Sequence, residues 1–451
     1  MFSKYLFFLS LSVLVFGGAF LFGAYAHRGD YFPIPQLRTV YHTLHSDSAI
    51  ADFVGDPRRH HLQPSRGQGS GVVTNKAADS EALIMLVGFF DDENQVRVIH
   101  RDGSLKWKWS LNYFDHFPVA ETRVCDVETP LRLDIHGAHI TPEGEVLANY
   151  EYCGTVKVDR CSGLVWSISK PTHHSLVKAE NGGYWILGRH IWKASEFPDR
   201  FPPFSTAAKN QDILEDTLMR VSEDGEIIEE FSIPQLLVDN GMLPLLTANG
   251  ENFTTKDVLR SEIVHANQAN ELPAAMADAF PLFEAGDIVI SMRQLNLVVV
   301  LDPENRIIKW HQTGPWLRQH DAEFRPDGRL SIFNNNVFRT AYSRERTRLD
   351  TPFKTNIIVV DPVTRTTEVV FGEQPDQKLL SVIRGQHQIV ESDGVLITEF
   401  DAGRVLEIDR NGQVVWEYVN DFDENNVGEI TNAAILPLDY FKTELAPCTD
   451  N

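Results

Sequence analysis

Histidines recur at a fixed distance from a turn glycine in this chain of 451 residues. Three of them stand eight residues before such a glycine: His136 before Gly144, His174 before Gly182 and His320 before Gly328. A lone histidine on a strand usually has a structural role, but a strand does not require an imidazole. Recurrence at one position therefore indicates that these side chains share a site.

Two less regular copies extend the pattern to five. Before Gly394 the position belongs to Gln386, with His387 as its neighbour. His265 fits if residues 273–284, which are acidic and alanine-rich, form a loop insertion before Gly286. The remaining histidines that we considered lie outside the pattern, and we expect structural roles for them: His60, His61, His100 and His311.

Arginine and asparagine recur on the other side of the same glycines. Seven residues after the glycine stand Arg189, Arg293 and Asn335. A buried cationic side chain is costly unless it meets an anion, so an arginine here favours anion binding. The alternative is an ion pair with a carboxylate of a neighbouring sheet, an interpretation that suits Arg189 better than Arg293.

Three histidines and an arginine in one pocket suit a tetrahedral oxyanion. A neutral imidazole can attack a sulfur or phosphorus centre, while cationic neighbours stabilise the charge that develops on the oxygens. A copper, zinc or iron site is the competing chemistry, because neutral histidine is a common metal ligand. Arg293 would repel a cation, and the sequence contains neither CxxC nor HExxH. We therefore expect an anion site without a metal or cofactor.

A second repeat shows which elements position these residues. A polar turn followed by an apolar strand ending on an aromatic residue occurs six times, at Trp109, Trp166, Phe231, Trp310, Phe371 and Trp416. Each copy is typical of the hairpin that closes a small antiparallel sheet, and the copies lie about 45 to 80 residues apart. The sequence thus predicts an all-β fold, a six-bladed β-propeller over residues 81–437 with a C-terminal tail over 438–451. Equivalent positions in its blades meet at the mouth of the axial channel.

The N-terminus is directed to a membrane. Residues 5–26 carry no charge and are long enough to cross a bilayer core as a helix. We expect a transmembrane anchor over residues 1–26, a polar tether over 27–80 and a propeller on the periplasmic or extracellular side. Cleavage near Ala26, which would give a secreted protein, is the alternative. Helical patterns elsewhere are confined to residues 35–45 and 233–246.

Composition limits the partners and the compartment. A net charge of −22 argues against nucleic acid, which needs a basic surface, but not against a small anion in a recessed site. Four cysteines fit an exported protein. Cys153 and Cys161 flank a predicted strand whose ends are too far apart to bridge if it is extended, so Cys125 with either of them is as plausible. The partner of Cys448 stays open.

Four segments resemble the arylsulfotransferase family: VHANQANEL with GDIVISMR, RQHDAEFRPDGRLSIFNNN, YSRERTRLD, and GQHQIVESDGVLITEF through GQVVWEY. The similarity covers residues 131–419 and is strongest over 264–336. The resemblance implies an exported six-bladed propeller that moves a sulfuryl group from a phenolic sulfate ester to another phenol or hydroxyl acceptor. It also implies a sulfohistidine intermediate and no nucleotide sulfate donor.

The resemblance assigns roles to particular residues. His320 in QHDA matches the family's histidine nucleophile, His265 its His-x-Asn histidine and Arg293 the arginine of its S-S-R segment. His174 is the weaker match to a histidine of an earlier blade, where His173 is the alternative. We expect these four to be catalytic, and a further set to bind substrate: His136, Asn335, Arg189 and His387.

The chain also departs from the family pattern. Met292 replaces a small residue, Asn334 stands where Asp is frequent, residues 273–284 are inserted, and His387 stands where relatives often have Ala-Gln. These differences concern the substrate more than the fold. The alternative function is therefore a non-catalytic or metal-binding propeller that acts as a binding module outside the cytoplasm.

Overall fold

The computed structural model of the protein describes residues 2–29, 56–76, 81–193, 212–246, 262–337, 354–390, 394–445 and 447–448. The chain divides into two compact units, Met1–His60 and His61–Asn451. The first contains helix α1 (Phe2–Gly29), whose stretch Lys4–Tyr25 is apolar and long enough to span a membrane. A cleaved signal sequence would share these properties. The predicted helix over residues 35–45 lies outside the described residues.

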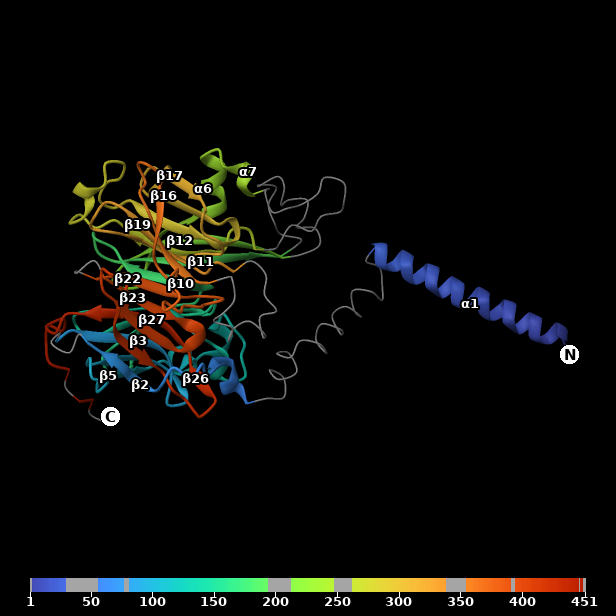
Figure 1. Cartoon of the computed structure of the whole chain (residues 1–451), viewed down its shortest axis with the longest axis horizontal. Coiled ribbons are helices and arrows are strands. Elements are labelled where there is room, and N and C mark those ends of the chain that lie inside the picture. The colour runs from blue at the N-terminus through green and yellow to red at the C-terminus, as the bar shows by residue number, and fades with distance from the viewer. Residues whose placement is uncertain are drawn as a thin grey trace. The chain divides into compact units, whose positions relative to one another are not determined.

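Six antiparallel sheets, here called blades and numbered along the chain, form the second unit (Figure 1). Blade 1 contains β3 (Leu83–Phe90), β4 (Glu93–Ile99) and β5 (Leu105–Ser110), and β27 (Ile430–Leu436) completes it. Blade 2 contains β6 (Ile135–Ile140), β7 (Val146–Tyr150), β8 (Gly154–Val158) and β9 (Leu164–Ile168). Blade 3 contains β10 (Thr172–Lys178), β11 (Tyr184–Trp192), β12 (Ile213–Val221) and β13 (Ile227–Ser232).

The other three blades repeat this four-stranded order. Blade 4 contains β14 (Ala266–Glu271), β15 (Ile288–Met292), β16 (Leu297–Asp302) and β17 (Ile307–Thr313). Blade 5 contains β18 (His320–Phe324), β19 (Leu330–Asn334), β20 (Asn356–Val360) and β21 (Thr367–Phe371). Blade 6 contains β22 (Gln386–Ile389), β23 (Val395–Glu399), β24 (Arg404–Ile408) and β25 (Val414–Val419).

The innermost strands close a ring. Strands β6, β10, β14, β18, β22 and β27 contact one another in this order, and β27 returns to β6. Strand β27 comes from the C-terminal end of the chain but pairs with β3 near the start of the unit, and the two lie side by side in Figure 1. The predicted six-bladed propeller is thereby confirmed, and the hydrophobic core lies between neighbouring blades.

The repeated aromatic residues join neighbouring blades. All six lie on the fourth strands of their blades, as the repeat predicted. Four are tryptophans whose indole N–H donates to a backbone carbonyl in the next blade's turns: Trp109 to Gly144, Trp166 to Glu223, Trp310 to Pro362 and Trp416 to Arg101. A hydrogen-bonded indole can thus be buried at low cost, which explains why an aromatic residue ends each copy.

Segments on either side of the blades are also attached to them. Within the expected tether, β1 (Leu62–Pro64) pairs with β26 (Asn426–Gly428), and β2 (Gly71–Asn75) adds a fifth strand to blade 6 beside β25. Disulfides join Cys125 to Cys153 and Cys161 to Cys448. The alternative in which Cys125 pairs with one of the two neighbouring cysteines is therefore correct, and the C-terminal tail is fixed to blade 2.

In the part of the chain that the structure describes, the helices other than α1 are short. The predicted helical segment over 233–246 forms α6 (Ile233–Asp239) and α7 (Leu243–Leu246), with Gly241 between them. The other short helices are α4 (Tyr113–His116), η1 (Pro57–His61), η2 (Ala120–Thr122), η3 (Pro130–Arg132), η4 (Ala277–Ala279), η5 (Arg293–Leu295) and η6 (Phe400–Ala402). The expected insertion over 273–284 contains η4, and its Phe280 and Phe283 are buried between blades 4 and 5.

Candidate active site

The recurring histidines lie where the innermost strands begin. The pairing register shifts near the start of β6, β10, β14 and β18, so each strand has an irregularity beside its histidine. His174 and His265 both have a φ of 50°, a left-handed conformation that costs a non-glycine residue about 1–3 kcal/mol. Such strain persists only where the surrounding structure enforces it, and it is concentrated at functional sites.

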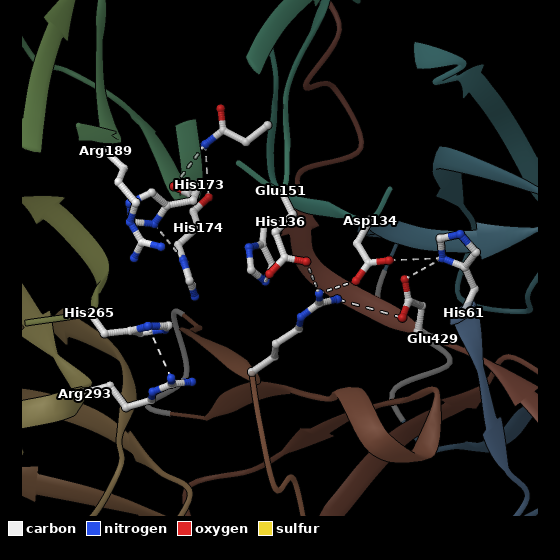
Figure 2. Close-up of polar contacts among 12 residues, drawn as sticks. His61, Asp134, His136, Glu151, His173, His174, Arg189, His265, Arg293 and Glu429 are labelled. Carbon is white, nitrogen blue, oxygen red and sulfur yellow. Dashed lines mark hydrogen bonds and ion pairs between the residues drawn. The ribbon is translucent and has the colours of Figure 1, made fainter. Parts of the chain in front are cut away.

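Four predicted site histidines form one cluster, with His174 at its centre. The His174 ring centroid lies 4.1 Å from that of His136, 5.0 Å from that of His265 and 6.2 Å from that of His320. All four residues are buried. Figure 2 shows His174 lying between His136 and His265, close to His173. The fixed spacing in the sequence thus brings imidazoles from four blades together.

His320 is held in one orientation by Asn335. The His320 Nδ1 atom lies 2.7 Å from Asn335 Oδ1, and Asn335 Nδ2 donates to the carbonyls of Ser381 and Arg384 at 2.9 and 2.8 Å. Because the amide N–H groups donate to carbonyls, Asn335 Oδ1 must accept a hydrogen bond from His320 Nδ1–H. The neutral ring therefore carries its hydrogen on Nδ1 and its lone pair on Nε2, which has no hydrogen-bond partner among the described residues.

The histidine cluster is electrically neutral near pH 7. Burial, followed by the charge of Arg293, holds the pKa of His320 well below its usual value of 6.5. Burial also places the pKa values of His136 and His174 well below this value, aided by the charge of Arg384 for His136 and by neighbouring histidines for His174. The pKa of His265 is lowered to about 4, again mainly by burial. Unprotonated imidazoles of this kind are competent nucleophiles and bases.

Arg293 lies at the edge of the cluster, beside His265. Its Nη2 atom is 3.2 Å from His265 Nδ1 (Figure 2). That nitrogen is also 2.7 Å from Glu262 Oε1. Arg293 Nη2 is 3.8 Å from Glu262 Oε2, beyond hydrogen-bond distance, and the side chain is 22% exposed. Its guanidinium is therefore partly open to solvent, where an anion could reach it. Glu262 was not foreseen, although it stands only three residues before His265.

Arg189 is bound to carboxylates. Its Nε donates to Asp216 Oδ1 at 2.8 Å and its Nη2 to Glu262 Oε1 at 2.7 Å, while its guanidinium stacks over the Tyr152 ring at 4.4 Å. The ion-pair alternative thus describes the contacts of Arg189, and Asp216 belongs to the next strand of the same blade. Arg189 supports the site through Glu262, which it shares with His265.

His387 lies outside the cluster. Its Nδ1 is 2.8 Å from Asp321 Oδ2 and its Nε2 is 2.7 Å from Ser331 Oγ, so it links blade 6 to blade 5. Asp321 Oδ2 also accepts the backbone N–H of His387 at 2.6 Å. Because Asp321 directly follows His320, this link fixes the backbone that carries His320.

His173 completes a hydrogen-bonded pair with His174. The two Nδ1 atoms are 2.8 Å apart, and His173 Nε2 is 3.1 Å from the carbonyl of Gly188. Since a carbonyl only accepts, His173 carries a hydrogen on Nε2. In the neutral pair His173 Nδ1 then accepts from His174 Nδ1, which leaves the lone pair of His174 on Nε2.

Two cavities lie along the axis. The small one, between the histidines, is lined by His136, His174, Asn267, His320, Asp321, Arg384, Gly385, Gln386 and Thr431. The larger one, of about 320 Å³, is lined by residues further along the innermost strands, including His139, Glu323 and His387, and shares Asp321 and Gln386 with the first. Asn267 and Arg384 were missed from the sequence, although Asn267 stands in the quoted HAN segment.

A propeller whose axis carries buried neutral histidines beside an accessible arginine defines a class of protein suited to oxyanion chemistry. The chain belongs to the arylsulfotransferase family, because the family model described as Arylsulfotransferase (ASST) matches residues 131–421, more than half of its length. This membership supports a sulfotransferase. The segment YSRERTRLD that contributed to the resemblance lies outside the described residues.

Solved structures with a similar overall shape are only distantly related. A protein of unknown function from Bacteroides caccae is 13% identical with a TM-score of 0.47, and the match covers 79% of this chain and 99% of that one. BamB from Moraxella catarrhalis is 11% identical with a TM-score of 0.32, over 83% and 88% of the two chains. No curated protein matches the chain. At these values the likeness supports no inference about function.

Proposed function

We propose that the protein transfers a sulfuryl group from an aryl sulfate ester to a phenolic or alcohol hydroxyl, with a sulfohistidine intermediate on His320 and no nucleotide donor. One observation carries the proposal: Asn335 holds the hydrogen of His320 on Nδ1, so that the Nε2 lone pair has no hydrogen-bond partner among the described residues. Burial and the charge of Arg293 hold the pKa of His320 well below 6.5, which favours the neutral ring. A nucleophile needs this tautomer and this protonation state.

The proposed reaction has two displacements at sulfur. In the first, the His320 Nε2 lone pair forms an N–S bond while the ester S–O bond breaks and the aryloxide leaves with the electron pair. In the second, the acceptor oxygen forms a new S–O bond, the N–S bond breaks, and Nε2 regains its lone pair. Neither step needs an oxidant, a metal or a nucleotide.

Arg293 and His265 are assigned to the sulfuryl oxygens in this proposal. The Arg293 guanidinium offers two parallel N–H donors to an oxyanion. Glu262 lies 2.7 Å from His265 Nδ1 and favours a hydrogen there, so Nε2 donates to sulfate only when the ring is protonated. An incoming anion favours that protonated form. The sulfuryl group also requires the rings around the small cavity to move apart, with His136 and Asn335 beside it.

His174 is assigned the proton transfer. In the resting protein its Nε2 carries a lone pair, the form that can accept a proton from the acceptor hydroxyl. In the first half-reaction the aryloxide leaves as an anion. The imidazolium formed in the second half-reaction then passes its proton to the released aryloxide or to water, which restores the neutral ring.

We further propose that α1 stays attached as an anchor and that the propeller lies outside the cytoplasm. The length and hydropathy of Lys4–Tyr25 support a membrane span. The two disulfides support an oxidising compartment. Intact-mass measurement of the mature chain checks the anchor, since a chain beginning near His27 would contradict it.

Trapping the intermediate tests the function. The purified full chain in detergent is mixed briefly with 4-nitrophenyl sulfate without acceptor, then digested and examined by mass spectrometry. We expect one sulfuryl group on the peptide that contains His320, and nitrophenol turnover when phenol is added. His320→Ala should give neither. Turnover of the donor without any histidine adduct would overturn the covalent mechanism, and no turnover of any aryl sulfate would favour the binding-module alternative.

A further inference from the structure

A second buried cluster surrounds His61, away from the histidine cluster (Figure 2, right). His61 ends η1, Asp134 directly precedes β6, and Glu429 lies between β26 and β27. Their exposed fractions are 0%, 3% and 1%. Three segments that are far apart in the sequence thus place an imidazole and two carboxylates together in the interior.

The hydrogen bonds of His61 fix its tautomer. Its Nε2 is 3.0 Å from the carbonyl of Leu131, so this nitrogen carries a hydrogen. In the neutral ring the lone pair is therefore on Nδ1, which lies 2.9 Å from Glu429 Oε1 and 3.4 Å from Asp134 Oδ1. A lone pair that faces two carboxylate oxygens is unfavourable unless a cation lies between them or the ring is protonated. Stacking on Phe89, with centroids 4.4 Å apart, holds the ring in this orientation.

The same two carboxylates present their other oxygens to Arg384. The guanidinium contacts Asp134 Oδ2 through Nη2, and its Nη1 is 3.8 Å from Glu429 Oε2. It also contacts Glu151 Oε2 at 2.9 Å, so Arg384 touches all three carboxylates. An imidazole whose second nitrogen donates to a carbonyl, beside carboxylates that are themselves hydrogen-bonded, has the outer-shell arrangement typical of metal ligands.

We propose that His61, Asp134 and Glu429 bind one divalent cation of the zinc type. Their ligand atoms lie within 4.8 Å of one another. The N···O distance of 3.4 Å is that expected between two tetrahedral ligands that each lie about 2.0–2.2 Å from one ion. The other, 2.9 Å, is a hydrogen-bond distance, and this pair would have to open slightly to bind the ion. An imidazole nitrogen suits zinc, whereas calcium and magnesium favour oxygen ligands.

The position of the site gives the metal a structural role. His61 directly precedes β1, which pairs with β26, and Glu429 directly precedes the ring-closing strand β27. Asp134 belongs to the segment that enters blade 2. An ion bound to all three residues would fasten the ends of the propeller unit to each other at the point where the ring closes.

The metal content of the full chain in detergent tests this proposal. We expect about one equivalent of zinc in protein expressed with zinc. Chelation should lower the unfolding midpoint, and re-added Zn²⁺ should restore it. Glu429→Gln keeps the shape but removes a charged ligand, so Zn²⁺ affinity should fall more than about 100-fold, beyond the effect of outer-shell changes. His320→Ala is the matched control and should bind Zn²⁺ like the wild type.

Three outcomes would overturn the zinc site. The first is a wild-type chain that contains no metal and whose unfolding midpoint is unchanged by Zn²⁺ or Mn²⁺, which would show that His61 is a protonated ion-pair partner. The second is His61→Ala with a full equivalent of zinc. The third is loss of zinc in His320→Ala but not in Glu429→Gln, which would show that the metal binds at the histidine cluster instead. The wild-type measurement decides the question even if a variant fails to fold.

Discussion

The amide of Asn335 decides which nitrogen of His320 is free. Its two N–H groups are held by the carbonyls of Ser381 and Arg384, so the amide cannot rotate to offer a donor to the imidazole. The orientation of His320 thus depends on backbone positions around residues 381–384, in the segment leading into blade 6. The side chain of Asn335 can therefore control the nucleophile by fixing its tautomer, apart from any contact it makes with the substrate.

Replacing this amide with a carboxylate should change the pH profile. In Asn335→Asp the negative charge beside His320 Nδ1 favours the imidazolium and raises its pKa, by about 1 unit or more. In the wild type, kcat/KM should fall only well below pH 6.5, because burial lowers the pKa of His320. The fall should begin at a higher pH in the variant. Asn336→Asp is the matched control, and an identical profile in both variants would contradict the positioning role.

The two arginines should respond differently to the same substitution. Arg293→Lys keeps a charge but loses the paired donors, so kcat/KM for 4-nitrophenyl sulfate should fall about 100-fold with little change in stability. Arg189→Lys disrupts the contacts with Asp216 and Glu262 and should mainly lower the free energy of unfolding. Steady-state kinetics and urea unfolding on both variants separate the effects. Equal kinetic losses with unchanged stability would show that Arg189 also binds the anion.

At the scale of elements, the link between blades 5 and 6 holds the start of β18 in place. His387 bridges Asp321 on β18 and Ser331 on β19 from its position on β22. Asp321 has a φ of 37°, so its backbone adopts a conformation that its own side-chain contacts must help to stabilise. The strand that carries His320 is therefore positioned by the adjacent blade as well as by its own.

Removing this bridge should weaken the fold measurably. His387→Ala leaves Asp321 and Ser331 without an imidazole partner, so the free energy of unfolding should fall by about 1–3 kcal/mol. Ser331→Ala loses one neutral hydrogen bond and should cost about 1 kcal/mol. Chemical denaturation of both variants measures the difference. A larger loss in Ser331→Ala than in His387→Ala would show that the link to Asp321 contributes little.

The same elements show what the sequence could reveal. Fixed spacing from a turn glycine predicted that His136, His174 and His320 converge, because equivalent positions in a propeller have equivalent radii. An ion pair was the stated alternative for Arg189, but its partner Asp216 could not be named, since residues 194–211 separate β11 from β12 and hide the register that places Asp216 opposite. Gln386 lines the small cavity between the histidines, whereas its neighbour His387 lines only the larger one, so a substrate contact by His387 stays a prediction.

At the scale of the whole molecule, many buried histidines make the fold sensitive to acid. Burial lowers the pKa of His139 to about 4 and that of His265 to about 4, and it lowers those of His136, His174 and His320 well below 6.5. In the unfolded chain these histidines titrate near pH 6.5. Just below this pH the unfolded chain therefore binds protons that the folded chain does not bind. Stability should therefore be highest above this pH and decrease as the pH falls below it.

The size of the effect can be checked with one residue. At pH 5 a histidine whose pKa is 6.5 unfolded and about 4 folded reduces stability by about 2 kcal/mol relative to pH 7.5. His139→Gln should make the loss of folding free energy between pH 7.5 and pH 5 smaller by this amount. The loss caused by the other buried histidines should remain. Unfolding midpoints measured from pH 8 to pH 5 test this, and a variant with the same slope as the wild type would contradict it. His100→Gln, outside the axial cavities, is the control.

The closure of the ring by β27 determines when the protein can fold. A ribosome makes β3 first and its partner β27 last, after five other blades have emerged. Until then the inner edge of blade 1 has no partner strand. The disulfide between Cys161 and Cys448 also cannot form before Cys448 has been made. A nascent chain stopped shortly before residue 430 would contain every residue of the histidine cluster and still lack a closed ring. A product that stops before β27 therefore leaves β3 unpaired at its inner edge, a feature that chaperones and proteases can recognise.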